Sequence, residues 1–284
     1  MPLSKPTIGF ISDEAGLASM ERHAPDKDGK GPFCLAEQFS SDIASRLTMD
    51  YSGEQVAAGS IAVFPIYGYI YYDRAPWYFS TRNFIQDIKA ADENPSISAH
   101  LLYIDTPGGE AFGLPEAFET IRSLKKPVYA FVDSMAASAG YYFAAGAKKI
   151  YAGSIFSNIG CIGAMAEMYD DTEYDKNMGF RRIVLRSAYS PLKNKMAEDV
   201  VEGHPEEYIR ERLDPLAEKF ISDVRSARPD IKEDSDALKG KIYFAAVAQG
   251  EGLIDGVMKL DEVLDEIAAD CKLPQNDEIY SIIL

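Results

Sequence analysis

The sequence DSMAASAGYY, at residues 133–142, follows an apolar stretch at residues 128–132 that is typical of a buried strand. Residues 140–147 then predict a helix, so Ser138 lies where a strand gives way to a helix. A serine there is close to free backbone N–H groups and to the positive end of the helix dipole, which favours an acyl-transfer nucleophile. The same pattern is typical of an N-cap serine in a contact between small residues.

A second segment, LLYIDTPGG at residues 101–109, predicts an apolar strand that ends in a Pro-Gly-Gly turn before a helix over residues 113–124. Glycines let a ligand approach the backbone closely, and their N–H groups can converge on one site. The N–H groups of Gly108 and Gly109 are therefore candidates for an oxyanion hole, and Gly108 is also a candidate for substrate binding. A strand-to-helix turn without chemistry would give the same pattern.

A third segment, RSAYSPLKNK at residues 186–195, follows a short strand expected over residues 182–185. A serine nucleophile needs a base, and none of the three histidines lies in a motif that suggests a Ser-His-Asp triad. A lysine whose pKa is lowered by burial can replace histidine. Lys193 is the candidate base and Lys195 the alternative, although most lysines are solvated surface charges.

Taken together, these segments resemble peptidase family S49, which contains signal peptide peptidase A and its phage and prophage relatives. The resemblance covers residues 61–264, and each motif is weak alone, but the four in order are specific. The motifs D-S-P-G-G, A-A-S-G-G-Y-Y, G-S-I-G-V and S-P-x-K are matched by residues 105–109, 136–142, 160–164 and 190–193. Three substitutions depart from the pattern: Thr106 and Cys161 replace serines, and Ala139 replaces a glycine.

The resemblance implies a ClpP/crotonase-like α/β core with a mostly parallel sheet flanked by helices. It also implies a serine endopeptidase with a Ser-Lys dyad, in which Ser138 is the nucleophile and Lys193 the general base. The backbone N–H groups of Gly109 and Ala139 would form the oxyanion hole, and no metal or cofactor would be needed. Ser134 is the alternative nucleophile, farther from the helix start.

The order of elements supports the same fold class without the resemblance. Predicted strands at residues 61–68, 97–105 and 128–132 alternate with predicted helices at 81–91, 113–124 and 139–147, which is typical of a parallel α/β sheet. Ligands in such sheets bind beyond the carboxyl ends of the strands, where the Pro-Gly-Gly segment and Ser138 are both expected.

The flanking regions predict a two-part organisation. Residues 1–58 are interpreted as an N-terminal arm or processed leader, and residues 59–284 as the peptidase domain with its C-terminal helices. Those helices are expected at residues 205–228, with a kink or a break at Pro215, and at 244–250 and 260–270.

Composition excludes several classes of protein. The net charge of −16 argues against binding to nucleic acid or to anionic membranes. Cys34, Cys161 and Cys271 form no zinc-site spacing, and no apolar run is long enough for a membrane span or a signal peptide, so a cytoplasmic protein is expected.

The sequence is compatible with several functions. The resemblance implies peptide or protein substrates and a homo-oligomeric ring, and its phage branch suggests a role in capsid construction. The alternatives are a catalytically inactive scaffold or assembly protein that keeps the fold, and an acyl-CoA enzyme of the crotonase type.

Overall fold

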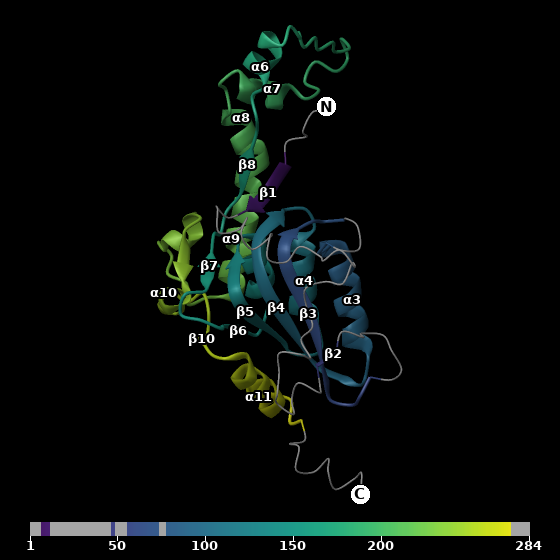
Figure 1. Ribbon diagram of the computed structural model, residues 1–284, viewed down its shortest axis with the longest axis vertical. Coiled ribbons are helices and arrows are strands. Elements are labelled where there is room, and N and C mark those ends of the chain that lie inside the picture. Colours follow the sequence, from purple (N-terminus) through teal and green to yellow (C-terminus); the bar gives the residue numbers. More distant parts are fainter. Residues whose placement is uncertain (1–6, 12–46, 49–55, 74–77, 274–284) are drawn as a thin grey trace, which may run out of the picture.

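The computed structural model describes residues 7–11, 47–48, 56–73 and 78–273. All four ranges contribute strands to one central sheet (Figure 1). The longest path through the sheet runs β10-β6-β5-β4-β1-β8. Strand β3 pairs with the edge of β4 opposite to β5 and β1. Antiparallel pairing occurs only at β1 and at β7–β9 within these residues, so the predicted mostly parallel α/β sheet is confirmed. The described strands are β1 Thr7–Ile11, β2 Leu47–Thr48, β3 Ser60–Ile70, β4 Ile97–Glu110, β5 Val128–Ala137, β6 Lys149–Ala152, β7 Asn158–Gly160, β8 Met165–Glu167, β9 Ile242–Phe244 and β10 Gly256–Val257.

Helices cover both faces of the sheet. The predicted helices over residues 81–91, 113–124, 139–147, 244–250 and 260–270 are confirmed to within a few residues at each end. The described α-helices are α3 Thr81–Glu93, α4 Leu114–Ser123, α5 Ala139–Ala145, α6 Thr172–Asn177, α7 Lys195–Val201, α8 Glu206–Tyr208, α9 Asp214–Ala227, α10 Ala245–Gly250 and α11 Leu260–Asp270.

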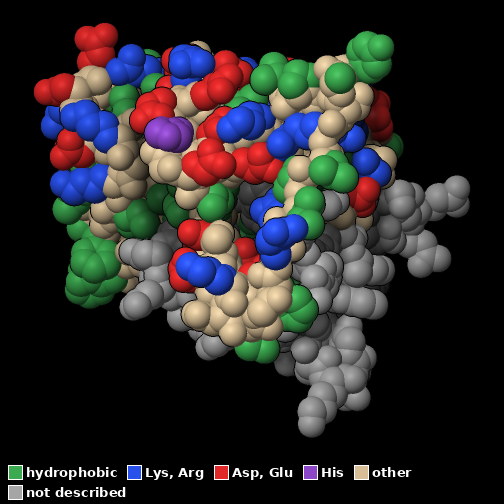
Figure 2. Space-filling view, turned by 90° about the horizontal axis from the view of Figure 1, so that it is seen from above, with side chains coloured by type: hydrophobic (Ala, Val, Ile, Leu, Met, Phe, Trp, Pro, Cys, Tyr) green, Lys and Arg blue, Asp and Glu red, His purple; other side chains and the backbone are tan. Residues whose placement is uncertain are grey.

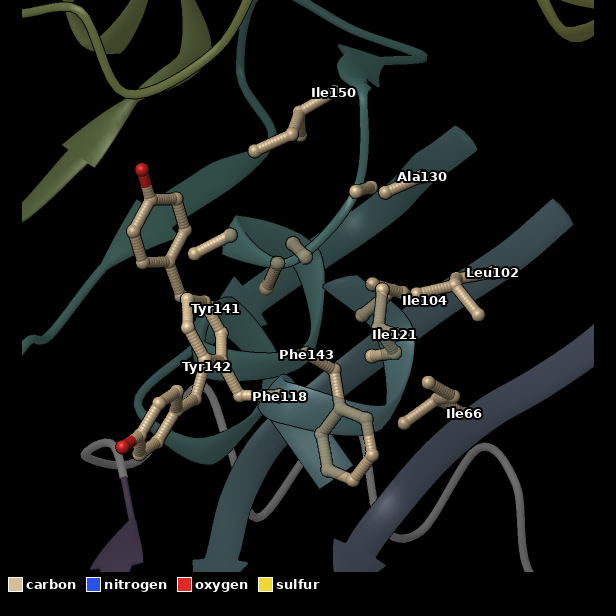
Figure 3. Close-up of a cluster of buried hydrophobic side chains, with 14 of the residues drawn as sticks. Ile66, Leu102, Ile104, Phe118, Ile121, Ala130, Tyr141, Tyr142, Phe143 and Ile150 are labelled. Atoms are coloured by element: carbon tan, nitrogen blue, oxygen red, sulfur yellow. The ribbon is translucent and has the colours of Figure 1, made fainter. Parts of the chain in front are cut away.

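The alternation of side chains along β3 and β4 divides the core into two layers. Phe64 of β3 and Leu102 of β4 face one layer, which is covered by α3, α4, α5 and α9. Val63 and Leu101 face the other layer, against α11. Figure 3 shows part of the larger layer, where the consecutive aromatic residues of α5 extend in different directions among aliphatic side chains. These contacts hold α5, and with it the preceding Ser138, firmly on the sheet.

Two strand predictions need correction. The strand that was expected to end before Pro-Gly-Gly continues to Glu110, because β3 and β1 both pair with this segment. The strand expected over residues 182–185 is absent: these residues form no strand and are exposed, and no strand of the described residues pairs with them. An apolar stretch without a neighbouring strand cannot complete its backbone hydrogen bonds as a sheet.

The predicted interruption near Pro215 is confirmed. A π-helical segment, Ile209–Leu213, separates α8 from α9, and Pro215 lies in the first turn of α9. An apolar stripe recurs at helical spacing in this region, at Ile209, Leu213, Leu216, Phe220 and Val224. Its two ends differ in burial, since Phe220 is buried whereas Ile209 is exposed. Only the C-terminal half of the stripe therefore packs on its own core.

Candidate active site

Ser138 connects β5 directly to α5, as the sequence pattern predicts. Its backbone has a φ of 57° and a ψ of −119°, and only 1% of the residue is exposed. Non-glycine residues rarely adopt this conformation, and such strain concentrates at functional sites. The Ser138 N–H donates to the Gly160 carbonyl at 2.8 Å, and its hydroxyl makes no capping hydrogen bond to α5. The N-cap interpretation therefore does not explain the serine.

Ser134, the alternative nucleophile, occupies a different environment. It lies within β5, four residues before the strand-to-helix connection. Ser134 therefore lacks the position at the start of a helix that led us to single out Ser138.

Thr106 joins the Pro-Gly-Gly segment to the serine segment. Its hydroxyl donates to the Gly68 carbonyl at 2.5 Å and accepts from the Gly108 N–H at 3.0 Å. In the register of the sheet Thr106 pairs with Ala136, and a Cβ on Gly140 would lie 2.3 Å from the Thr106 methyl carbon. The sequence motif presented Thr106 only as a replacement for serine; its contacts show that it positions Gly108 beside the start of α5.

The candidate oxyanion donors flank this junction. Gly108 has a φ of 109°, and a Cβ on Gly109 would lie 2.0 Å from the Ile70 carbonyl oxygen, so glycine is required at both positions. Ala139 is the first residue of α5 and is fully buried. N–H groups in the first turn of a helix have no partner within the helix, so that of Ala139 is suited to stabilising an oxyanion.

Lys193 lies in a different part of the molecule. We call residues 168–207 the arm; none of its side chains is buried. Lys193 is exposed in an arm loop, its carbonyl accepts from Arg186 Nε at 2.7 Å, and α7 begins two residues later. Figure 1 shows α7 at the far end of the arm, away from the sheet. A single chain therefore does not bring Lys193 to Ser138.

Lys195, the alternative base, is engaged with acidic groups. It forms an ion pair with Asp199 on the next turn of α7 and lies 3.8 Å from Glu202. The hydrogen bond with Asp199 raises the pKa of Lys195. A general base needs the opposite shift, which makes Lys195 the less suitable lysine.

Arg186 anchors the loop that carries Lys193. Besides its bond to the Lys193 carbonyl, its guanidinium lies 2.5 Å from a carboxylate oxygen of Glu198 in α7. Both side chains are only 20% exposed, and a shielded pair of this kind holds a loop better than a solvated pair does. The segment RSAYSPLKNK contains this arginine, but the sequence offered no sign of its partner.

The described histidines are not placed as partners of Ser138. His100 is buried opposite Val128, at the start of β5, and its ring nitrogen lies 3.2 Å from Asp92. Ser138 follows the other end of β5, and His204 is exposed in the arm. Neither histidine of the described chain supports a Ser-His-Asp triad.

The environment of Cys161 and the capacity to bind a metal ion also bear on the chemistry of the site. Cys161, which replaces a serine of the family motif, is half-buried with a φ of 59°, and its N–H donates to the Lys241 carbonyl at 3.0 Å. The described residues contain no group of side chains that could hold a metal ion. They also contain no helix that is long and apolar enough to cross a membrane.

Comparison with known proteins gives two family matches. The model of peptidase family S49 matches residues 120–274, and the Clp protease model matches residues 78–153. Among solved structures, a membrane-bound stomatin-specific protease with a substrate peptide covers 74% of this chain and 79% of its own, at 18% identity and a TM-score of 0.44. ClpP1 from Listeria monocytogenes covers 71% and 94% at 13% identity and a TM-score of 0.42.

Several curated relatives carry protease names. A protein of Enterococcus faecium named for signal peptide peptidase SppA is 26% identical over 69% of this chain and 57% of its own length. The chloroplastic serine protease SPPA of Arabidopsis thaliana is 25% identical over 70% of this chain and 30% of its own. Protease 4 of Haemophilus influenzae is 27% identical over 63% and 29%. This chain thus spans between about a third and somewhat over half of these relatives.

The S49 model covers more than half of the chain and includes both Ser138 and Lys193. The sheet, the strained serine connection and the adjoining glycines all belong to the same described domain. The chain is a member of peptidase family S49.

Proposed function

We propose that this chain is a serine endopeptidase that uses Ser138 as nucleophile and Lys193 as general base. The observation that carries the proposal is the strained, buried connection at Ser138, whose hydroxyl does not cap α5 and which adjoins Gly108 and Gly109 through Thr106. Membership of a serine peptidase family supports the same chemistry.

The proposed reaction proceeds in two halves. Neutral Lys193 Nζ takes the proton from Ser138 Oγ, which attacks the peptide carbonyl carbon while the N–H groups of Gly109 and Ala139 hydrogen-bond the developing oxyanion. The lysinium then protonates the leaving amine as the C–N bond breaks. A water deprotonated by Lys193 attacks the acyl-serine and releases the carboxylic acid, which restores the free hydroxyl.

We propose that Lys193 comes from a neighbouring copy of the chain in a homo-oligomeric ring. The arm exposes large apolar side chains near Lys193: Leu185 is 90%, Tyr189 97% and Leu192 79% exposed. Large apolar side chains exposed so fully within one short segment of sequence support an interaction surface. Figure 2, which views the molecule from above, shows intermixed acidic and basic side chains with hydrophobic ones toward the margins of this face. A second copy that covers the arm would also bury the base, as a lowered lysine pKa requires.

The proposed substrates are peptides or proteins. A role in phage or prophage capsid construction is proposed from the sequence resemblance alone, and an inactive scaffold would share the fold. A crotonase-type acyl-CoA enzyme would use a similar oxyanion hole but would have no use for a nucleophilic serine with a lysine base.

A fluorophosphonate probe with mass spectrometry, combined with casein hydrolysis, tests the proposal. We expect labelling of Ser138 in the native protein, and loss of both labelling and hydrolysis in Ser138→Ala with an unchanged melting temperature. Ser134→Ala is the matched control and should keep both. Hydrolysis by Ser138→Ala at the native rate would refute the assignment, and an unlabelled, inactive native protein would favour the scaffold or the acyl-CoA enzyme.

A further inference from the structure

Strand β1 lies between two strands that are otherwise separated. It pairs antiparallel with β4, placing Phe10 opposite Gly109 and Ile11 opposite Gly108. On its other side it pairs antiparallel with β8, placing Gly9 opposite Met165. Figure 1 shows β1, in dark purple, beside β8 at the upper end of the sheet.

The position of β1 is set by the point where β5 leaves β4. The pairing of β4 with β5 ends at Thr106 and Ala136, while β7 pairs with the other edge of β5 as far as Ala137 and Gly160. Along the next residues of β4, β1 takes the place that β5 has left. Ser138 follows Ala137 directly, so β1 begins its contact with β4 at the fork that carries the candidate nucleophile.

Without β1, this fork is a groove one strand wide. Among the described strands β8 pairs with β1 alone, so residues 108–110 of β4 and 165–167 of β8 would face each other across two strand spacings of about 4.8 Å each. Both edges would then present unpaired backbone groups. Such edges bind an extended peptide by adding it as a strand.

We propose that residues 7–11 of the chain occupy the peptide groove beside Ser138 as a tethered competitor of the substrate. The inference rests on the proposed function, because the groove is a substrate site only if Ser138 is the nucleophile. It also defines the substrate class: an extended, unfolded segment that the main chain recognises on both sides. The N-terminal segment must leave before such a substrate can bind.

Gly9→Pro is the sharpest variant, because Gly9 pairs with Glu110 on one side and with Met165 on the other. Proline removes the N–H and restricts φ, so it weakens β1 in the groove. Ser4→Pro introduces the same residue three positions before Thr7 in the sequence and is the matched control. If β1 occupies the groove with a tenfold preference, Gly9→Pro should lower KM for a fluorogenic extended peptide about tenfold with kcat within about twofold. Ser4→Pro should match the native protein.

An unchanged KM in Gly9→Pro, or lost activity with a lowered melting temperature, would overturn the inference, since β1 would then be only a structural strand. A second readout does not depend on catalysis: fluorescence anisotropy of a labelled peptide with the sequence of residues 5–13. It should bind Gly9→Pro more tightly than the native chain, and equal or absent binding would again overturn the inference. If no variant hydrolyses peptides and the fluorophosphonate leaves Ser138 unlabelled, the proposed function fails, and the binding experiment then decides only whether residues 7–11 occupy the groove.

Discussion

At the scale of single residues, Thr106 shows how closely the two halves of the candidate site depend on each other. Its hydroxyl fixes Gly108 and Gly68, while its methyl group fills the space that the absent side chain of Gly140 leaves. The sequence places Thr106 in one motif and Gly140 in another, and only the parallel pairing of β4 with β5 brings them together. A serine at residue 106 would keep the hydroxyl but leave a gap against Gly140.

This contact yields a paired prediction. Gly140→Ala should destabilise the protein by about 1–3 kcal/mol, because the new Cβ would lie 2.3 Å from the Thr106 methyl carbon. Thr106→Ser removes that methyl group and keeps the hydroxyl, so the double variant should recover most of the loss. Urea unfolding of the two single variants and the double variant gives the coupling. Additive losses would show that the clash lies elsewhere.

The choice between the two lysines is also a question of single residues. Arginine keeps the positive charge but cannot accept a proton near neutral pH, so Lys193→Arg should be as inactive as Lys193→Ala. Lys195→Ala loses only the pairing with Asp199 and Glu202 within the arm, and its kcat should stay within about threefold of the native value. Peptide hydrolysis by the purified variants is the measurement, and the reverse pattern would make Lys195 the base.

At the scale of elements, hydrophobic periodicity predicted what depends on local packing. The helices α3, α4, α5, α10 and α11 and the first halves of β3, β4 and β5 follow from runs of apolar residues that the core buries. The second half of β4 did not, because Pro-Gly-Gly is typical of a turn, and the segment is extended only through pairing with β3 and β1. Pairing between strands that are far apart in the sequence cannot be predicted from the spacing of apolar residues within one segment.

The contact between α5 and α9 links the serine connection to the base of the arm. Tyr142 of α5 stacks on Phe220 of α9 with ring centroids 4.2 Å apart, and its hydroxyl donates to Asp223 at 2.5 Å. Lys219 donates to the other carboxylate oxygen of Asp223 at 2.7 Å. Burial raises the pKa of the Tyr142 phenol, which therefore remains a hydrogen-bond donor at neutral pH.

Tyr142→Phe tests this link. The variant keeps the stacked ring but removes one donor from the buried Asp223 carboxylate, which should cost about 1–3 kcal/mol of stability. The matched control is Tyr243→Phe, since Tyr243 is a half-buried tyrosine of β9 outside this contact. We expect this control to change stability by less than about 0.5 kcal/mol. Denaturant titration measures both, and equal small effects would mean that the Asp223 bond contributes little.

At the scale of the whole molecule, the sequence predicts least about the arm, whose side chains a single chain leaves exposed or half-buried. Residues 182–185, three of them apolar, suggested a strand, yet they form no strand and are exposed. The motif S-P-x-K indicated Lys193, but no pattern in the sequence tells whether its partner serine belongs to the same chain. A site that is divided between copies can be recognised from motifs, while its geometry depends on the assembly.

A mixing experiment decides whether the site is divided. Ser138→Ala keeps the base and Lys193→Ala keeps the nucleophile, so each variant alone should be inactive. If Lys193 serves the neighbouring chain, random co-assembly of equal amounts makes about one site in four complete, and about a quarter of the native activity should return. The variants should be mixed after dissociation and reassembled together, with a Ser138→Ala/Lys193→Ala double variant replacing one partner as the control. If both residues act within one chain, no mixed assembly contains a complete site and activity stays absent. Light scattering at the assay concentration supplies the second criterion, because a fully active monomer would exclude the divided site.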